Sequence, residues 1–276
     1  MTIRRMSTNH THVSIRTRST GSFRSAEHQH YRATQHQQRE QYTATPFFSV
    51  IICTYNRRNM VLTALASLRK QTLSYQNFEV IIVDNDSSDG TFNAVQTYLM
   101  VDHVQRRNTR EPLRAQCLQE KRNGLAHARN MGLAAASGEV AVFLDDDVIA
   151  DPLFLEHLYS AYKETAADAI GGSVDIHWEA QRPYWLSDEM LDTLGRYMPF
   201  RTRTQLPISF SFSNSCFSVK RTAVLTVGGF SPFLSKRLHT PISVEIIDLC
   251  RRLRQEGYQL WYEPKAEVLH RVTRAR

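Results

Sequence analysis

The chain of 276 residues has no apolar run near the roughly 18 residues that a membrane-spanning helix needs. No secretory signal peptide, with a charged start followed by an apolar centre, is recognisable. Cysteine is scarce and shows no paired spacing, which argues against a disulfide framework and against a zinc site. A cytoplasmic protein is the simplest expectation from these absences. The four cysteines are Cys53, Cys117, Cys216 and Cys250.

The positive charge of the chain is concentrated at its beginning. Residues 1–46 contain seven Arg and two Glu, which accounts for five of the seven net positive charges. Their low apolar content predicts a disordered basic tail. A targeting peptide, a peripheral electrostatic tether to an anionic membrane and a start codon placed too far upstream all stay open as explanations. The remainder lacks a basic stripe interleaved with aromatic residues, so we expect no nucleic-acid partner.

The pattern after the tail predicts one α/β domain over residues 47–276, with a mostly parallel sheet flanked by helices. Residues 101–120 are weakly patterned, and only a short strand near 101–104 is expected there. We expect a nucleotide-sugar-binding half over 47–150 and an acceptor-side half over 170–276. The expected strands are 47–53, 78–83, 140–144, 170–176, 210–219 and 260–262, and the expected helices are 59–72, 91–100, 122–136, 152–163, 220–227 and 245–256. Residues 177–207 are expected to form an irregular insert and residues 231–243 a loop.

The stretch from Val140 to Ile149 runs from five apolar residues directly into three acids. Such a run is typical of a strand buried on both faces, so Asp145, Asp146 and Asp147 would emerge at the edge of the sheet. Neighbouring carboxylates repel each other, and a divalent cation such as Mg²⁺ or Mn²⁺ is the usual counter-charge. The alternative is a solvated acidic turn that begins the next segment.

Three predicted strands each end in a polar loop. These loops begin at Thr54, Asp84 and Asp145. Parallel strands joined by right-handed crossovers deliver their carboxyl ends to one edge of the sheet, which is where ligands bind in open α/β folds. We therefore expect the three loops to meet in one ligand site.

Several short motifs follow one another in a characteristic order, at residues 49–57, 83–91, 123–132, 143–147, 228–230 and 248–257. Together they resemble the family 2 glycosyltransferases, which are inverting enzymes of the GT-A type, over residues 47 to 272. The resemblance implies a metal-dependent enzyme that moves a sugar from a nucleotide-sugar donor to a hydroxyl of a glycan, lipid or protein. Polysaccharide or glycoconjugate synthesis is the expected setting.

The resemblance also implies roles for individual residues. Alternatives stay open for five of them: Tyr55 could pack on a helix, Asp84 or, more readily, Asp86 could form a turn, Arg129 could make an ion pair, and His270 could be structural. The implied donor-binding residues are Thr54, Tyr55, Asn56, Asp84, Asp86, Arg129, Asn130, Asp145 and Asp146. The implied ligands of Mn²⁺ or Mg²⁺ are Asp147, Asp145 and His270.

One position departs from the family pattern. The usual general base is the second acid of a pair that precedes the helix of residues 248–257, and here that position holds Ile246, which cannot accept a proton. The first acid is retained as Glu245, which we favour as the base. Two alternatives are open: another acid serves (Asp175, Glu179 or Asp188), or the chain binds donor with little turnover. Asp248 is expected to pair with Arg252 on the helix surface instead.

Two further functions compete with sugar transfer: nucleotidyl transfer and an adaptor role of the basic tail. A nucleotidyltransferase would carry a glycine-rich basic loop after the first strand, and residues 54–58 contain no glycine. An adaptor acting through the basic tail would lose its function when residues 1–46 are deleted. Trp178, Tyr184 and Trp185 could form a stacking platform for an acceptor sugar or a hydrophobic clasp over the sheet.

Overall fold

The computed structural model describes residues 45–106, 113–237 and 244–273. The predicted basic tail lies outside these residues, except for its last two positions. Within the described part of the chain, no helix combines the length and the apolar character that crossing a membrane requires.

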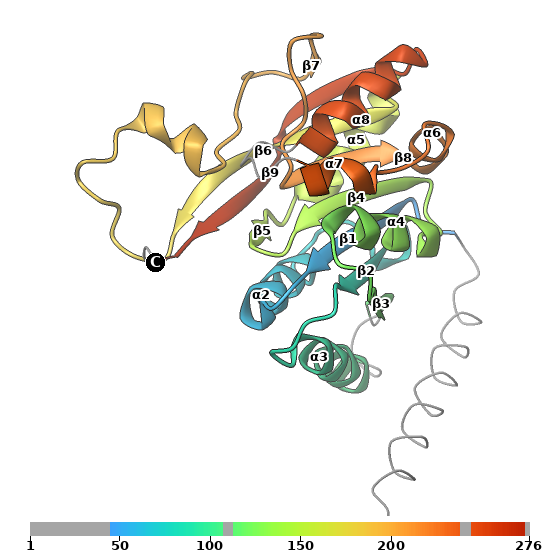
Figure 1. The fold of residues 1–276 in the computed structure, drawn as a ribbon, viewed down its shortest axis with the longest axis vertical. Helices are drawn as coiled ribbons and strands as arrows, with labels where there is room; N and C mark the ends of the chain where they lie inside the picture. The colour runs from blue at the N-terminus through green and yellow to red at the C-terminus, as the bar shows by residue number, and fades with distance from the viewer. Residues whose placement is uncertain (1–44, 107–112, 238–243, 274–276) are drawn as a thin grey trace, which may run out of the picture. The chain divides into compact units, whose positions relative to one another are not determined.

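Nine strands within the described ranges form a single mixed sheet in the order β3-β2-β1-β4-β8-β6-β9-β5, with β7 beside β9 (Figure 1). The first four in this order are parallel, and β8 is antiparallel to both of its neighbours. This confirms a mostly parallel α/β sheet in the first half of the domain. The strands are β1 (Phe48–Thr54), β2 (Phe78–Asp84), β3 (Ala115–Gln119), β4 (Val140–Asp145), β5 (Val148–Ala150), β6 (Ala169–Trp178), β7 (Thr204–Gln205), β8 (Cys216–Lys220) and β9 (Leu260–Val272).

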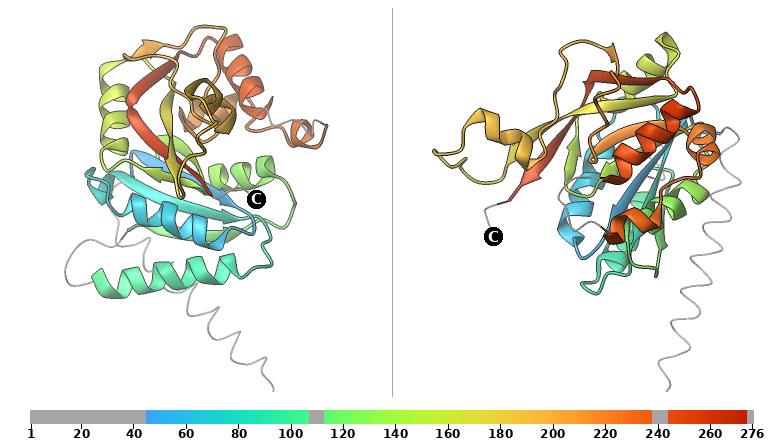
Figure 2. Two further views of the ribbon diagram at one scale, coloured as in Figure 1. Left: turned by 90° about the vertical axis from the view of Figure 1, so that its left-hand side faces the viewer. Right: turned by 45° about the horizontal axis from the view of Figure 1, so that its top comes forward.

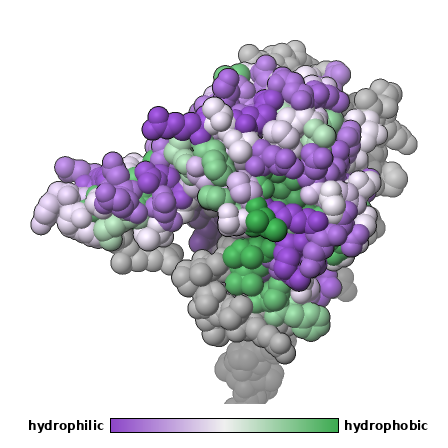
Figure 3. All heavy atoms as spheres, turned by 90° about the horizontal axis from the view of Figure 1, so that it is seen from above, coloured by the Kyte–Doolittle hydropathy of each residue, from purple (hydrophilic) through white to green (hydrophobic). Residues whose placement is uncertain are grey.

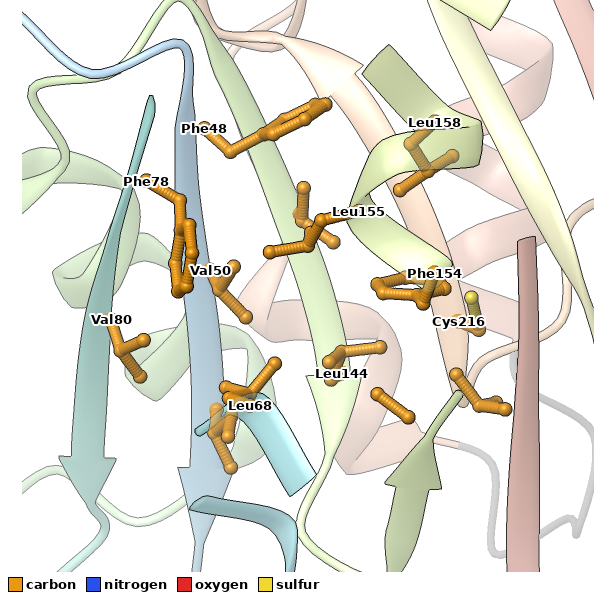
Figure 4. Packing of buried hydrophobic residues seen from close by; sticks show 14 of the residues in the cluster. Phe48, Val50, Leu68, Phe78, Val80, Leu144, Phe154, Leu155, Leu158 and Cys216 are labelled. Carbon is orange, nitrogen blue, oxygen red and sulfur yellow. The ribbon is translucent and has the colours of Figure 1, made fainter. Parts of the chain in front are cut away.

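Helices cover both faces of this sheet. Alternate side chains of β1 point to opposite faces, so Val50 belongs to one apolar cluster and Ile51 to the other. The first cluster packs under α2 (Arg58–Leu68), α3 (Thr91–Arg106) and α5 (Phe154–Glu164), and part of it is drawn in Figure 4. The second packs under α4 (Leu125–Ala135), α6 (Arg221–Thr226) and α8 (Val244–Gln255). Burial on both faces explains the uninterrupted apolar runs of the central strands.

Several predicted elements were wrong or incomplete. The strand expected near residues 101–104 is part of α3, and the edge strand is β3. Residues 232–237 of the expected loop form α7 (Pro232–Arg237), while residues 238–243 lie outside the described residues. The final strand spans Leu260–Val272. It was predicted to be only three residues long, because polar residues and Pro264 interrupt its apolar pattern. The short β5 was not predicted.

The long strands β6 and β9 pair in parallel and carry residues 179–203 away from the rest of the sheet (Figures 1 and 2). This segment, called the insert below, is mostly irregular and contains one 3₁₀ helix, η2 (Asp188–Leu194). The irregular stretch was predicted over 177–207, but its first two residues belong to β6 and β7 lies near its end. Tyr184 and Trp185 in the insert are exposed. On the face of the molecule drawn in Figure 3, hydrophilic side chains prevail, and apolar ones gather near the middle.

Candidate active site

The first two loops meet at the carboxyl edge of β1 and β2. Thr54 and Asp84 are partners in the parallel register, and Cys53 is the partner of Asp145 on the other side. The backbone N–H of Asn85 donates to the carbonyl of Thr54 at 2.8 Å. The Thr54 hydroxyl donates to Oδ2 of Asp146 at 2.7 Å. The predicted convergence of three loops at one edge is therefore confirmed.

Asn56 and Asp86 shape these loops. Both have left-handed backbones, with φ angles of 53° and 65°. Oδ1 of Asn56 accepts from the backbone N–H groups of Ser88 (2.8 Å) and Asp89 (3.3 Å), so it joins the first loop to the second. These contacts support the turn-forming alternative for Asp86 and give Asn56 a structural role, while donor binding by either residue stays a prediction. Tyr55 is 52% exposed, so a face of its ring is open for stacking.

Asp84 carries a buried carboxylate that is only half satisfied. Its Oδ2 accepts from the backbone N–H of Ser87 at 3.1 Å. Its Oδ1 is buried and has no hydrogen-bond partner among the described residues. Buried polar atoms are almost always paired, so this oxygen is suited to a donor supplied by a ligand.

Asp146 holds the loops together instead of facing outward. It is 5% exposed, and it accepts hydrogen bonds from Thr54 and, at 2.9 Å, from Nη1 of Arg57. Burial raises its pKa, although both hydrogen bonds oppose the shift. Arg57 also donates to Oδ2 of Asp147 at 2.8 Å, so its single positive charge is shared by two of the three neighbouring acids. Arg57 was not among the predicted site residues, although its place directly after Asn56 in the first loop was a usable signal.

Asp147 and His270 form the second part of the site. Nε2 of His270 lies 3.6 Å from Oδ2 of Asp147, and Oδ1 of Asp147 is buried without a partner in the described chain. Burial alone would raise the pKa of Asp147, but its contact with His270 and the positive charges of His270 and Arg57 lower it overall. The same contact raises the pKa of His270. His270 lies within β9, not after it as expected.

Arg129 is buried between two acids. Its side chain is 3% exposed, and its guanidinium lies 3.7 Å from Oδ1 of Asp145 and 3.4 Å from Oε2 of Glu245. It also donates to Oδ1 of Asn214 at 2.7 Å, and Asn214 in turn donates to Asp145 at 3.3 Å. Burial raises the pKa of Asp145 to about 6, against the opposing charge of Arg129. The structure thus favours the alternative that Arg129 makes ion pairs, and these pairs are buried. Asn214 lies 69 residues from Asp145, and nothing in the sequence signalled it.

The position of Arg129 follows from how α4 packs. A Cβ at Gly132 would collide with the side chain of Ile51, so this helix can approach β1 closely only with glycine there. The guanidinium also lies over the rings of Phe217 and Phe230, at 5.8 and 5.4 Å from the ring centres. Asn130 has a structural role: its amide nitrogen donates to the carbonyl of Phe230 at 2.8 Å, and its oxygen accepts from the N–H of the same residue. Donor binding by Asn130 stays a prediction.

The start of α8 separates Glu245 from Ile246. Ile246 is fully buried in the second apolar cluster, whereas the Glu245 side chain, 11% exposed, points to Arg129 in the site. The two residues are neighbours on a helix and therefore project about 100° apart. The pair between Asp248 and Arg252 is present at 2.7 Å, as predicted.

The other acids weighed as bases have partners elsewhere. Glu179 pairs with Arg271, and Asp188 is exposed and pairs with Arg182 at 2.6 Å. Asp175 accepts from the backbone N–H of the next residue at 2.8 Å. Arg271, the partner of Glu179, donates its backbone N–H to the carbonyl of Asp147 at 2.9 Å. Glu245 is the acid that pairs with the buried Arg129, which also contacts Asp145.

Two side chains of the site are suited to hold a divalent cation that takes its other ligands from water or substrate. Among the described residues, no three His, Cys, Asp or Glu side chains converge as a ready metal-binding group. Asp147 and His270 nonetheless offer a carboxylate and an imidazole side by side, and one buried carboxylate oxygen lacks a partner. Mg²⁺ and Mn²⁺ sites commonly use one or two protein ligands and take the rest from water and substrate phosphates. The chain thus fits such a cation through Asp147 and His270, while direct ligation by Asp145 stays a prediction.

The open α/β sheet, with acids and a buried arginine at its carboxyl edge, agrees with the GT-A fold that the structural matches show. The family model for glycosyl transferase family 2 matches residues 49–228, so the chain belongs to glycosyl transferase family 2, an inverting GT-A family.

Two curated relatives illustrate the family likeness. The chain is 28% identical to the glucosyl-dolichyl phosphate glucuronosyltransferase of Haloferax volcanii over 236 residues, which is 81% of this chain and 69% of that protein. It is 32% identical to glycosyltransferase GlyG of Streptococcus pneumoniae over 126 residues, which is 45% of this chain and 38% of that protein.

Two solved structures show the same fold. The mannosyltransferase PcManGT of Pyrobaculum calidifontis, in complex with GDP-Man and Mn²⁺, superposes with a TM-score of 0.61 at 18% identity and covers 90% of this chain. TarS 1–349 of S. aureus, in complex with UDP-GlcNAc, gives 0.58 at 20% identity and covers 83%. The chain spans 66% and 59% of these two chains. At these identities the likeness shows the fold alone.

Proposed function

We propose that the chain transfers a sugar from a nucleotide-sugar donor to a hydroxyl acceptor, with inversion at the anomeric carbon and with Mn²⁺ or Mg²⁺ as cofactor. One observation carries this proposal: Asp84, Asp147 and Glu245 all lie in one chain of contacts at the carboxyl edge of the sheet. Thr54 pairs with Asp84 and donates to Asp146, and Arg57 joins Asp146 to Asp147. Arg129 contacts both Asp145, the neighbour of Asp146 in the chain, and Glu245.

The proposed donor site uses the first two loops. The unpartnered Oδ1 of Asp84 would accept a hydrogen bond from an N–H of the base, which both uracil and guanine offer. Tyr55, exposed at the same edge, would stack on the planar base. Solved relatives in complexes with UDP-GlcNAc and with GDP-Man are compatible with either base.

The proposed cation site uses the end of the third loop. Asp147 and His270 would hold Mn²⁺ or Mg²⁺, and the bound cation would stabilise the negative charge that develops on the departing nucleoside diphosphate. Arg57 contributes a fixed positive charge at the same place, because it already contacts both Asp146 and Asp147.

The proposed base is Glu245. Its Oε2 faces Arg129, which holds the carboxylate in one orientation, and the attacking hydroxyl would pass its proton to this carboxylate. The Glu245→Gln variant keeps the shape and loses the proton acceptor, so transfer should fall by about 10²–10⁴-fold with little change in donor binding. Glu256→Gln is the control, because Glu256 follows the same helix and is exposed. Release of nucleoside diphosphate from a panel of nucleotide sugars with Mn²⁺ is the measurement, and equal rates for Glu245→Gln and wild type would refute this role.

A second candidate is a protein that binds nucleotide sugar with little or no turnover. The full burial of Ile246 favours it, because the usual base position faces the core and cannot act. The same assay separates the two candidates. Mn²⁺-dependent donor binding without release of nucleoside diphosphate, with or without acceptor, would support the second.

The proposed acceptor lies on the insert side. Trp185 is 64% exposed and Tyr184 fully exposed there, and aromatic rings of this kind can stack on a sugar of a glycan, lipid or protein. The dolichyl phosphate named for the Haloferax volcanii relative makes a lipid-linked acceptor the first to test. Such an acceptor would place the enzyme at the cytoplasmic surface of a membrane, in contact through the basic tail.

A further inference from the structure

We propose that Leu194 and Gly195, at the end of η2 in the insert, are positioning residues that fix the ring of His270 for cation binding. The inference rests on the proposed function, because it assigns a role toward the cation. It connects His270 of the proposed cation site to the insert, which is remote from His270 in the sequence.

A hydrogen bond from His270 to the insert determines which ring nitrogen carries the proton. Nδ1 of His270 lies 2.9 Å from the carbonyl oxygen of Leu194. A carbonyl can only accept, so Nδ1 must carry a proton. In the neutral imidazole the lone pair is then on Nε2, and this is the nitrogen that faces Asp147, 3.6 Å from its Oδ2. Metal-binding histidines commonly have such a partner on the other nitrogen, and its loss typically lowers metal affinity 10–100-fold.

The turn is built closely around the ring. Gly195 has φ of 98°, a left-handed conformation that other residues rarely adopt. A Cβ at this position would lie 3.2 Å from Nδ1 of His270, so the backbone favours glycine and a side chain would crowd the ring. Any side chain here would push the ring or move the carbonyl of Leu194.

The insert, and not β9, fixes the turn. Nε of Arg196 donates to Oδ1 of Asp192 at 2.9 Å, and its Nη2 donates to the carbonyl of Asp188 at 3.0 Å, which ties both ends of η2. The backbone N–H of Tyr197 then donates to the carbonyl of Val174 on β6 at 2.8 Å. The orientation of His270 therefore depends on how the insert is folded.

The test compares two variants of the turn with matched controls. Gly195→Ala disturbs the turn at the ring, and Gly257→Ala is its control, because Gly257 has φ of 82° and nothing within 4 Å of an added Cβ. Arg196→Gln loosens η2 without adding bulk, and Arg251→Gln, which removes an exposed ion pair on α8, is its control. Mn²⁺ is titrated into each protein with saturating UDP or GDP, whichever stabilises the wild type more, and free Mn²⁺ is followed by electron paramagnetic resonance.

We expect Gly195→Ala to weaken Mn²⁺ binding about tenfold, Arg196→Gln to weaken it less, and both controls to stay within about twofold of wild type. A second readout needs no metal. The protein is labelled with ¹⁵N at histidine, and the nitrogen shifts are measured at a pH where His270 is neutral. The ring proton of His270 should reside on Nδ1 in the wild type and be shared with Nε2 in both turn variants.

Wild-type Mn²⁺ affinity and an unchanged ring proton in Arg196→Gln and in any folded Gly195→Ala would overturn the inference. If Gly195→Ala fails to fold, Arg196→Gln decides. If the wild type itself binds no Mn²⁺, the proposed function fails, and the nitrogen shifts still show whether Leu194 sets the ring proton.

Discussion

The two sides of the site are built in different ways. The donor side consists of buried strands whose loops are held by buried polar groups, such as Asp146 and Arg129, at 5% and 3% exposure. The insert is held by ion pairs with exposed members, such as the pair of Asp188, whose side chain is 77% exposed. Surface pairs contribute little, typically below about 1 kcal/mol, whereas buried groups cannot lose a partner cheaply. The residues proposed to bind the donor thus lie in the buried part of the structure, and the residues proposed to meet the acceptor lie on the insert, whose ion pairs have exposed members.

The largest loss of stability is expected at Ile246, which lies in the apolar core beside Glu245. Ile246→Glu would place a carboxylate in a fully buried apolar position, so we expect a loss of about 4 kcal/mol in the free energy of unfolding and no gain in transfer. Ile247→Glu, at a neighbouring position of 46% exposure, should cost less than about 0.5 kcal/mol. Urea denaturation measures both. A stable Ile246→Glu variant with raised activity would show that residue 246 can reach the site.

The second effect concerns the buried arginine. Arg129→Met would leave Asp145 and Glu245 without their shared counter-charge, so we expect a loss of about 3 kcal/mol in unfolding free energy together with reduced transfer. Arg251→Met, which removes an exposed arginine from an ion pair on α8, is the control and should cost below about 1 kcal/mol. Similar unfolding curves for the two variants would argue against a buried charge network.

The smallest effect is expected on the insert. Trp185→Ala removes an exposed ring, so stability should change by less than about 0.5 kcal/mol. If the ring stacks on the acceptor, the KM for acceptor should rise about fivefold, which corresponds to about 1 kcal/mol, with the KM for donor unchanged. Leu225→Ala, which truncates an exposed side chain on α6, is the control. A change in donor KM alone would place Trp185 on the donor side.

The sequence predicted the central parallel strands and the acids at their carboxyl ends well because these signals are local. Buried parallel strands are continuous apolar runs, and the acids that follow them, such as Asp84 and Asp145, mark the edge of the sheet. The same reasoning missed β3 and most of β9, since half-exposed strands carry polar residues that hide the pattern. Two hydrogen bonds were beyond prediction: that from Asn214 to Asp145 and that from His270 to Leu194. Each joins residues 69 or more positions apart in the sequence.

The central claim is that a cation at Asp147 holds the diphosphate of the donor. The most direct test is the melting temperature of wild type, Asp147→Asn and the exposed control Asp188→Asn, each with UDP or GDP and with or without Mn²⁺. We predict that one nucleotide raises the Tm of wild type and of the control only when Mn²⁺ is present, and that Asp147→Asn loses this rise, because a ligand stabilises only the state that it binds. A rise of the same size in all three proteins without Mn²⁺, or no rise in any of them, would contradict the claim.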